Sequence, residues 1–152
     1  MVTTHGHDVT MLRLETEVLD VQPAVIATVR KEDLFGLRVD LAGWPQPSLT
    51  RSFNIKEKAN IKIISDDVCV QKLLVFNRRP NFQDNLFCTF TDPYVLMSNV
   101  NSGGPVLHDN KIIGVNKKTY PATEPEVDPR KVNIHFNLGY YLGFIHDIIS
   151  KC

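Results

Sequence analysis

The sequence lacks an excess of charge of either sign, and this absence removes two classes of partner. Its 17 lysine and arginine residues equal its 17 aspartate and glutamate residues, so the formal net charge is zero. The chain lacks the basic excess that would favour binding to nucleic acid, and it lacks an acidic tail that would indicate a charged partner. A hydrophobic share of 43% excludes a disordered chain.

Long apolar runs are also missing, so no segment is long enough to cross a bilayer as a helix. The first eight residues have no apolar core and therefore predict no signal peptide. With 152 residues the chain can bury one good core or two small ones.

Cysteine is scarce, and its count is odd. Cys69 and Cys88 are spaced so that they could close a modest loop, whereas Cys152 ends the chain without an evident partner. A fully reduced cytosolic protein fits these three cysteines as well, and nothing near them excludes it.

An unusual stretch of backbone runs from Asn99 to Pro105, where Ser102 is followed by Gly103 and Gly104. The glycines permit backbone angles closed to other residues, and the proline fixes the exit into an apolar strand. Such a turn can present a hydroxyl beside converging main-chain N–H groups, as a nucleophile with an oxyanion site requires. A surface turn before a buried strand is the alternative.

Short apolar segments separated by turn residues predict an all-β fold, either a sandwich or a barrel. Pro23 makes residues 18–29 a linker or an edge segment, and the prolines and acids of 120–129 predict an exposed loop. A short helix is expected over 68–76 after a cap at 65–67, and an apolar stripe from Tyr141 to Ile149 predicts a C-terminal helix. The predicted strands are 8–14, 34–42, 59–64, 85–90, 104–107, 111–116 and 132–138.

Eight short motifs follow one another in a fixed order over nearly the whole chain. They are Asp8–Leu14, Val21–Pro23, Ala42–Trp44, Asp66–Cys69, Leu86–Cys88, Ser102–Pro105, Ile112–Val115 and Tyr141–Ile145. In this order they resemble the chymotrypsin/trypsin family of serine endopeptidases.

The resemblance implies a fold of two six-stranded antiparallel barrels with the active site in the cleft between them. Residues 1–30 would supply the last strand of the first barrel and the crossing linker. Residues 31–152 would supply the second barrel and the C-terminal helix. The resemblance also implies a secreted protein that acts on or binds a protein or peptide, with no cofactor and no metal.

Catalysis in this family needs an acid, an imidazole and a serine. By the resemblance, Asp8 stands at the acid and Ser102 at the nucleophile. The imidazole has no counterpart, because the family carries it some tens of residues before the acid, and His5 and His7 are too close to Asp8. The remaining histidines, His108, His135 and His146, are interpreted as surface or satisfied core residues. Without a base, Ser102 is expected to be a poor nucleophile.

Two positions just before Ser102 also depart from the family pattern. Val100 stands where a family glycine helps to hold the oxyanion, and a β-branched residue disfavours that backbone conformation. Loss of one oxyanion donor typically costs on the order of 10²–10³ in rate. Asn101 replaces the aspartate that pairs with the N-terminus freed by zymogen cleavage, so activation by cleavage is not expected.

The positions that form the family's substrate pocket are changed as well. Leu96 stands at the pocket floor and removes the carboxylate that would select lysine or arginine. Lys117, Lys118 and Thr119 replace the Ser-Trp-Gly wall, and Asn133 replaces a pocket glycine. These larger side chains are expected to narrow or close the site.

The cysteines are consistent with the resemblance. Cys69 and Cys88 match one family disulfide, and a loop of that size should stabilise the fold by roughly 3 kcal/mol. Two other family bridges have lost both partners. One would have joined the positions of Val39 and His108, and the other would have started at Ser98.

Three hypotheses follow from these residues. The chain is a non-catalytic protease homologue kept for binding or regulation, or it is the C-terminal part of an active secreted endopeptidase. In the third, the second barrel stands alone as an interaction module, and the strand from Asp8 to Leu14 would then expose an unpaired edge.

Overall fold

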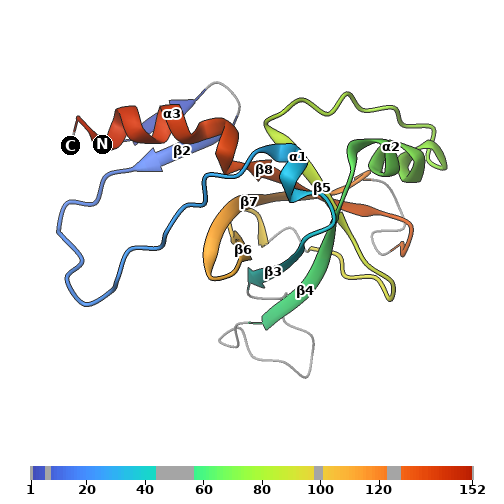
Figure 1. Ribbon diagram of the computed structural model, residues 1–152, viewed down its shortest axis with the longest axis horizontal. Helices are drawn as coiled ribbons and strands as arrows, with labels where there is room; N and C mark the ends of the chain where they lie inside the picture. Colours follow the sequence, from blue (N-terminus) through green and yellow to red (C-terminus); the bar gives the residue numbers. More distant parts are fainter. Residues whose placement is uncertain (1, 6–7, 44–56, 98–100, 123–127, 152) are drawn as a thin grey trace.

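A computed structural model of the protein describes residues 2–5, 8–43, 57–97, 101–122 and 128–151 (Figure 1). No helix in these ranges is both long and apolar enough to span a membrane. The elements, in chain order, are β1 (Val2–His5), β2 (Val9–Leu12), α1 (Lys31–Leu34), β3 (Arg38–Gly43), β4 (Glu57–Ile64), α2 (Asp66–Leu74), β5 (Leu86–Phe90), β6 (Pro105–His108), β7 (Lys111–Tyr120), β8 (Val132–Asn137) and α3 (Leu138–Ile149).

The strands β3 to β8 form a closed antiparallel barrel in the order β3-β4-β5-β8-β7-β6. The barrel closes where Asp40 pairs with Leu107 and Leu41 pairs with Val106, between β3 and β6. Closure leaves no barrel strand with an open edge. The predicted all-β antiparallel barrel, with a short helix and a C-terminal helix, is therefore confirmed.

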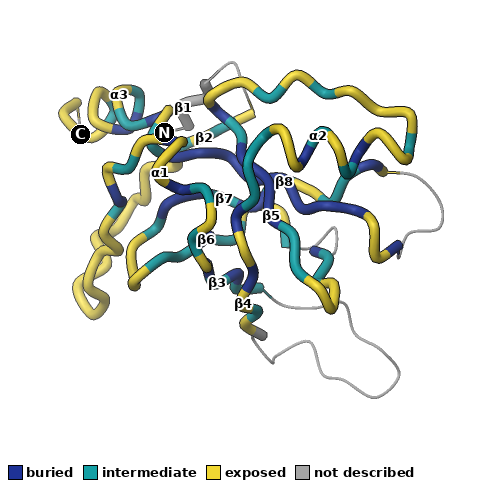
Figure 2. Tube along the Cα trace, turned by 45° about the vertical axis from the view of Figure 1, so that its right-hand side comes forward, coloured by how far each residue is buried: buried dark blue, intermediate teal, exposed yellow. Residues whose placement is uncertain are grey.

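Alternating side chains of the strands fill the barrel. Val39 and Leu41 on β3 face inward, as do Ile61 and Ile63 on β4, which is the period of two expected of strands. Phe87 on β5 is fully buried in the same cluster. Figure 2 shows these barrel strands buried at the centre and the linker after β2 exposed along most of its length.

Helix α2 packs against β5 and β8 and is joined to β5 by the disulfide Cys69–Cys88, with an S–S distance of 1.98 Å. This bond was predicted and is confirmed. The helix begins at Asp66, two residues earlier than predicted, because the Ser65 side chain accepts the Val68 N–H at its first turn. It ends at Leu74, since Asn77 shortly afterwards has a φ of 55°.

Helix α3 begins at Leu138, where the Asn137 side chain accepts the Gly139 N–H at 3.0 Å. Tyr141 and Ile145 are buried on one side of the helix, whereas Ile149 of the predicted stripe is 59% exposed. Strand β2 lies beside this helix at one end of the molecule, and α2 lies at the other end (Figure 1).

Two predicted strands have other bounds in the structure, and part of one predicted loop is not described. The strand predicted at 34–42 begins only at Arg38, because residues 31–34 form a helical turn and Gly36, with a φ of 88°, reverses the chain. Strand β7 continues to Tyr120 past a bulge between Asn116 and Lys118. Of the predicted loop 120–129, residues 123–127 lie outside the described ranges.

The N-terminal strand is paired rather than single. β2 pairs with β1 in an antiparallel hairpin in which Val2 lies opposite Leu12, so one edge of the predicted strand is covered. β2 ends at Leu12, and the linker then joins the barrel surface where Ile112 N donates to Val25 O and Ala27 N donates to Ile112 O. The linker or edge segment predicted at 18–29 thus adds a short bridge to β7.

Candidate functional site

The turn that carries Ser102 is held by backbone hydrogen bonds to β7. Gly103 N donates to Asn116 O at 2.8 Å, and Asn116 N donates to Gly104 O at 2.8 Å. Gly103 has a φ of 86°, and a Cβ on Gly104 would lie 2.8 Å from Ala42 O, so both positions require glycine. Ser102 itself is exposed at the tip. Val100, predicted to disturb the oxyanion site, lies outside the described residues.

Asp8, the predicted acid, lies at the start of β2 and is paired with a lysine. Its Oδ2 is 3.0 Å from Nζ of Lys117, while the Asp8 side chain remains 80% exposed. The Lys117 ammonium also lies 4.1 Å from the centre of the Phe136 ring. An ion pair so open to solvent contributes only about 0.2–1 kcal/mol to stability. Its importance is that, among the described side chains, Asp8 is paired with a cation and not with an imidazole.

His135 is fully buried and belongs to the core. Its Nε2 is 2.7 Å from Oγ1 of Thr89, its Nδ1 is 3.0 Å from Oδ1 of Asn116, and its ring stacks on Phe87. Burial lowers the pKa of His135 to about 3, so the ring is neutral at physiological pH. Nδ1 then donates to the Asn116 oxygen, and Nε2 accepts the Thr89 hydroxyl.

The other histidines with described side chains form no hydrogen bond to the predicted catalytic residues Ser102 and Asp8. His108 Nδ1 lies 2.9 Å from Arg38 O, and His146 is exposed on α3. In the described part of the chain, then, no histidine side chain bonds to Ser102 or Asp8. His5 and His7 were not expected to act as the base, and their side chains lie outside what is described.

Asn133, predicted at the substrate pocket, ties three segments together from a fully buried position on β8. Its Oδ1 accepts the Met97 N–H at 2.9 Å, and its Nδ2 donates to Val95 O at 2.7 Å. A side-chain amide thus pairs with a backbone segment in the way that a neighbouring strand would. Thr119, its partner across β7 and β8, places its hydroxyl 2.9 Å from both Asn133 Oδ1 and Met97 O.

The two lysines of the predicted pocket wall do not act together. Lys117 reaches Asp8, whereas Lys118, beyond the bulge, is exposed with its ammonium 5.2 Å from the centre of the Tyr120 ring. Sequence reasoning assigned Lys117 only to the wall and missed its ion pair with Asp8. No local signal could have found it, because the two residues lie far apart in the chain and meet only through the fold.

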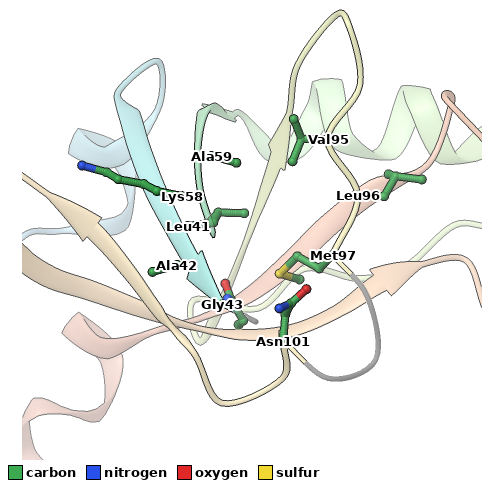
Figure 3. Close-up of a pocket in the computed structure, with 10 residues that line it drawn as sticks. Leu41, Ala42, Gly43, Lys58, Ala59, Val95, Leu96, Met97 and Asn101 are labelled. Atoms are coloured by element: carbon green, nitrogen blue, oxygen red, sulfur yellow. The ribbon is translucent and has the colours of Figure 1, made fainter. Parts of the chain in front are cut away.

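A cavity of about 160 Å³ lies between β3, β4 and residues 95–97, next to Asn101 (Figure 3). Its walls are mainly apolar, and an added Cβ on Gly43 would collide with the Asn101 side chain. Lys58 is the charged residue of this lining, and it binds Asp40 at 2.8 Å. The described residues of the lining include no carboxylate that could hold a free amine. Leu96, the predicted pocket floor, lines this cavity and is half-buried.

Comparison with known proteins gives one family and several similar folds. A family model described as Trypsin matches residues 2–142. Among curated proteins there is no match. Among solved structures, neuropsin, a serine protease expressed in mouse brain, has a TM-score of 0.74 at 22% identity over 95% of this chain and 63% of its own.

Two inactivated protease paralogues of the scabies mite are also similar. Paralogue S-I1 has a TM-score of 0.67 at 19% identity and covers 91% of this chain. Paralogue S-D1 has a TM-score of 0.68 at 17% identity and covers 93%. The chain spans 57% and 59% of these two structures, which is less than two thirds of their length.

At such identities these structures establish a shared fold, and the family match covers most of the chain. The six-stranded barrel and the Ser102 turn agree with this match. The chain belongs to the trypsin family of serine proteases.

Proposed function

We propose that this trypsin-like domain does not hydrolyse peptides and serves instead as a protein-binding or regulatory domain. The observation that carries the proposal is the ion pair between Asp8 and Lys117 at 3.0 Å. In the family's mechanism the acid orients an imidazole, and the imidazole removes the proton of the serine. Here the carboxylate is held by an ammonium, which has no lone pair with which to accept a proton.

The rest of the site supports the same proposal. Ser102 is exposed and has no hydrogen-bond acceptor among the described side chains, so its hydroxyl is not activated. Asn133, at a substrate-pocket position by the family resemblance, is buried and bonded to the backbone of 95–97, which supports a pocket closed to a substrate side chain. A cavity lining without a carboxylate agrees with Asn101 being unable to hold a freed N-terminus.

The test is covalent labelling of the folded chain with a fluorophosphonate, beside Ser102→Ala and an active trypsin. No labelling above the level of Ser102→Ala is expected, because labelling needs an activated serine. Labelling of the wild-type chain that Ser102→Ala abolishes would overturn the proposal.

A second candidate is that these residues form the C-terminal part of a longer, active endopeptidase. Two observations favour it. The chain spans only 57–63% of the solved structures it resembles. In addition, Leu12, Leu14 and Leu19 at and beyond the end of β2 are 69%, 64% and 80% exposed, as a surface covered by a further unit would be. Residues 1–30 would then complete a first barrel, and residues 31–152 would form the second.

This candidate is decided by the transcript. A longer reading frame that joins Met1 to an upstream barrel with a histidine and a signal sequence would establish it. Isolation of this chain as the complete secreted product would remove it. Under both candidates we propose secretion, because a structural disulfide such as Cys69–Cys88 persists in oxidising compartments.

A further inference from the structure

The end of the molecule that carries α2 has cations placed over aromatic rings. The Lys72 ammonium lies 3.3 Å from the centre of the Phe90 ring, and the Arg130 guanidinium lies 5.2 Å from that of Phe76. Both rings pack on the cluster around the Cys69–Cys88 disulfide. Contacts of this kind leave the other side of the cation open to an anion.

A groove of about 270 Å³ runs between the last turn of α2 and the segments 90–94 and 129–130. Its floor and walls are mainly apolar, and two of these side chains are open to solvent: Val75 is 59% exposed and Tyr94 is 45% exposed. The principal lining residues are Lys72, Val75, Phe90, Tyr94, Pro129 and Arg130.

The two cations of the groove differ in their partners. Arg130 is fixed by Asp128, whose carboxylate it binds through Nε at 2.9 Å and Nη2 at 2.6 Å, so its charge is balanced. The Asp128 side chain is only 5% exposed, which makes this support rigid. Lys72 forms no ion pair with a carboxylate in the ranges that the structure describes. Among the described residues, Asp92 is the acid that lines the groove.

We propose that this groove binds a short acidic peptide segment of a partner protein. One carboxylate of the peptide would pair with Lys72, and an adjacent bulky apolar side chain would lie against Val75, Phe90 and Tyr94. Among the described lining residues, only one cation has no ion pair with a carboxylate. This single charge, the acid Asp92 and the zero net charge of the chain disfavour a polyanion such as nucleic acid or a sulfated glycan. An apolar surface with one charge suits an acidic segment with an apolar anchor.

The proposal deepens the binding role proposed above but is tested separately from it, because the groove shares no residue with the Ser102 site. A suitable probe is a synthetic peptide with the sequence of residues 14–21, which contains three acidic and four aliphatic residues. Its Kd is measured by fluorescence anisotropy against the whole chain. The control peptide carries glutamine and asparagine in place of the acids.

Saturable binding of the acidic peptide is expected, weakened at least about tenfold by Lys72→Glu and by higher salt. Tyr94→Ala, a change at an exposed side chain, should weaken binding about threefold or more without altering the melting curve. Lys111→Glu, an exposed lysine on the β6–β7 turn that does not line the groove, is the matched control and should leave the Kd unchanged.

Equal affinity for the two peptides would overturn the proposal, as would a Kd that Lys72→Glu and Tyr94→Ala both leave unchanged. Absence of binding at peptide concentrations up to about 1 mM would also overturn it. Binding of a heparin oligosaccharide in place of the peptide would make the groove a polyanion site and the proposal wrong.

Discussion

The Ser102 turn and the surroundings of Asp8, the two parts of the site proposed from the family resemblance, are held in different ways. The turn is fixed by backbone hydrogen bonds to Asn116 and by glycines at crowded positions, so its shape does not depend on catalytic chemistry. The surroundings of Asp8 depend on which side chains face it, and there the Lys117 ammonium forms an ion pair with the carboxylate. Under the proposed function, the backbone of the turn keeps its shape although the reaction is lost.

Two buried polar side chains on β8, His135 and Asn133, are also held by contacts that serve the structure of the barrel. His135 and Asn133 lie two residues apart on β8, so their side chains point to the same face of the strand. Asn116 and Thr119 lie opposite them on β7. Both β8 residues use their side chains to satisfy the interior of the barrel rather than to face a substrate. Their hydrogen bonds make this side of the molecule part of the core.

The largest expected effect is a loss of folding stability at low pH, caused by His135. Its folded-state pKa of about 3 lies below the ordinary value of 6.5, so the unfolded chain takes up a proton that the folded chain does not. Stability is therefore complete above about pH 6.5 and falls by roughly 3 to 4 kcal/mol by about pH 4. Urea melts between pH 7 and 4 measure this slope.

His135→Gln is the control, because glutamine cannot titrate in this range. Its melts should show a flatter dependence of the free energy of unfolding on pH than the wild type. The same steep slope in both proteins would show that other groups cause it.

The next effect concerns the disulfide that holds α2 to β5, outside the two regions compared above. Replacing Cys69 and Cys88 with alanine should lower the free energy of unfolding by about 3 kcal/mol, since the bond closes a loop of 19 residues. Thermal or urea melts of the double variant check this value. A reducing agent should destabilise the wild type by a similar amount and leave the variant unchanged.

A smaller loss is expected from Asn133→Ala. The change leaves Met97 N–H and Val95 C=O without the side-chain partner that each now has, at a cost of about 1–3 kcal/mol. Amide hydrogen exchange at Met97 should accelerate together with the loss in stability. Asn60→Ala, on the exposed side of β4, is the matched control, and equal exchange at Met97 in both variants would contradict the assigned bridge.

The smallest effect is expected from Lys117→Ala, which removes the partner of the exposed Asp8. Loss of the ion pair should cost no more than about 1 kcal/mol, because solvent screens it, and loss of the ammonium over the Phe136 ring should add about 0.5–1 kcal/mol. No peptidase activity should appear, since the carboxylate would be released without gaining an imidazole. Urea melts and a peptide cleavage assay measure the two outcomes.

Much of the barrel could be predicted from the sequence, because strand periodicity and turn residues are local signals. The strands around Val39 and Ile61, the helix that begins near Asp66 and the Cys69–Cys88 bond are of this kind. The helical turn at 31–34 escaped prediction because it depends on burying Leu34 before the reversal at Gly36.

The site was less predictable. The candidate residues could be named by resemblance, but their partners are distant in the chain: Lys117 with Asp8, and Asn133 with Val95 and Met97. Which polar groups meet across such separations depends on the register of β7 and β8 and on the bulge between Asn116 and Lys118. Neither the bulge nor the register is visible as a local pattern.

The central claim, that the frame of the site persists without its chemistry, is tested most directly by the reactivity of Ser102 itself. Time-resolved mass spectrometry of the intact chain with a fluorophosphonate measures the rate constant for modification at this residue. The account predicts the same negligible rate in the wild type, in Lys117→Ala and in Ser102→Ala. A rate at Ser102 clearly above that of Ser102→Ala would contradict it.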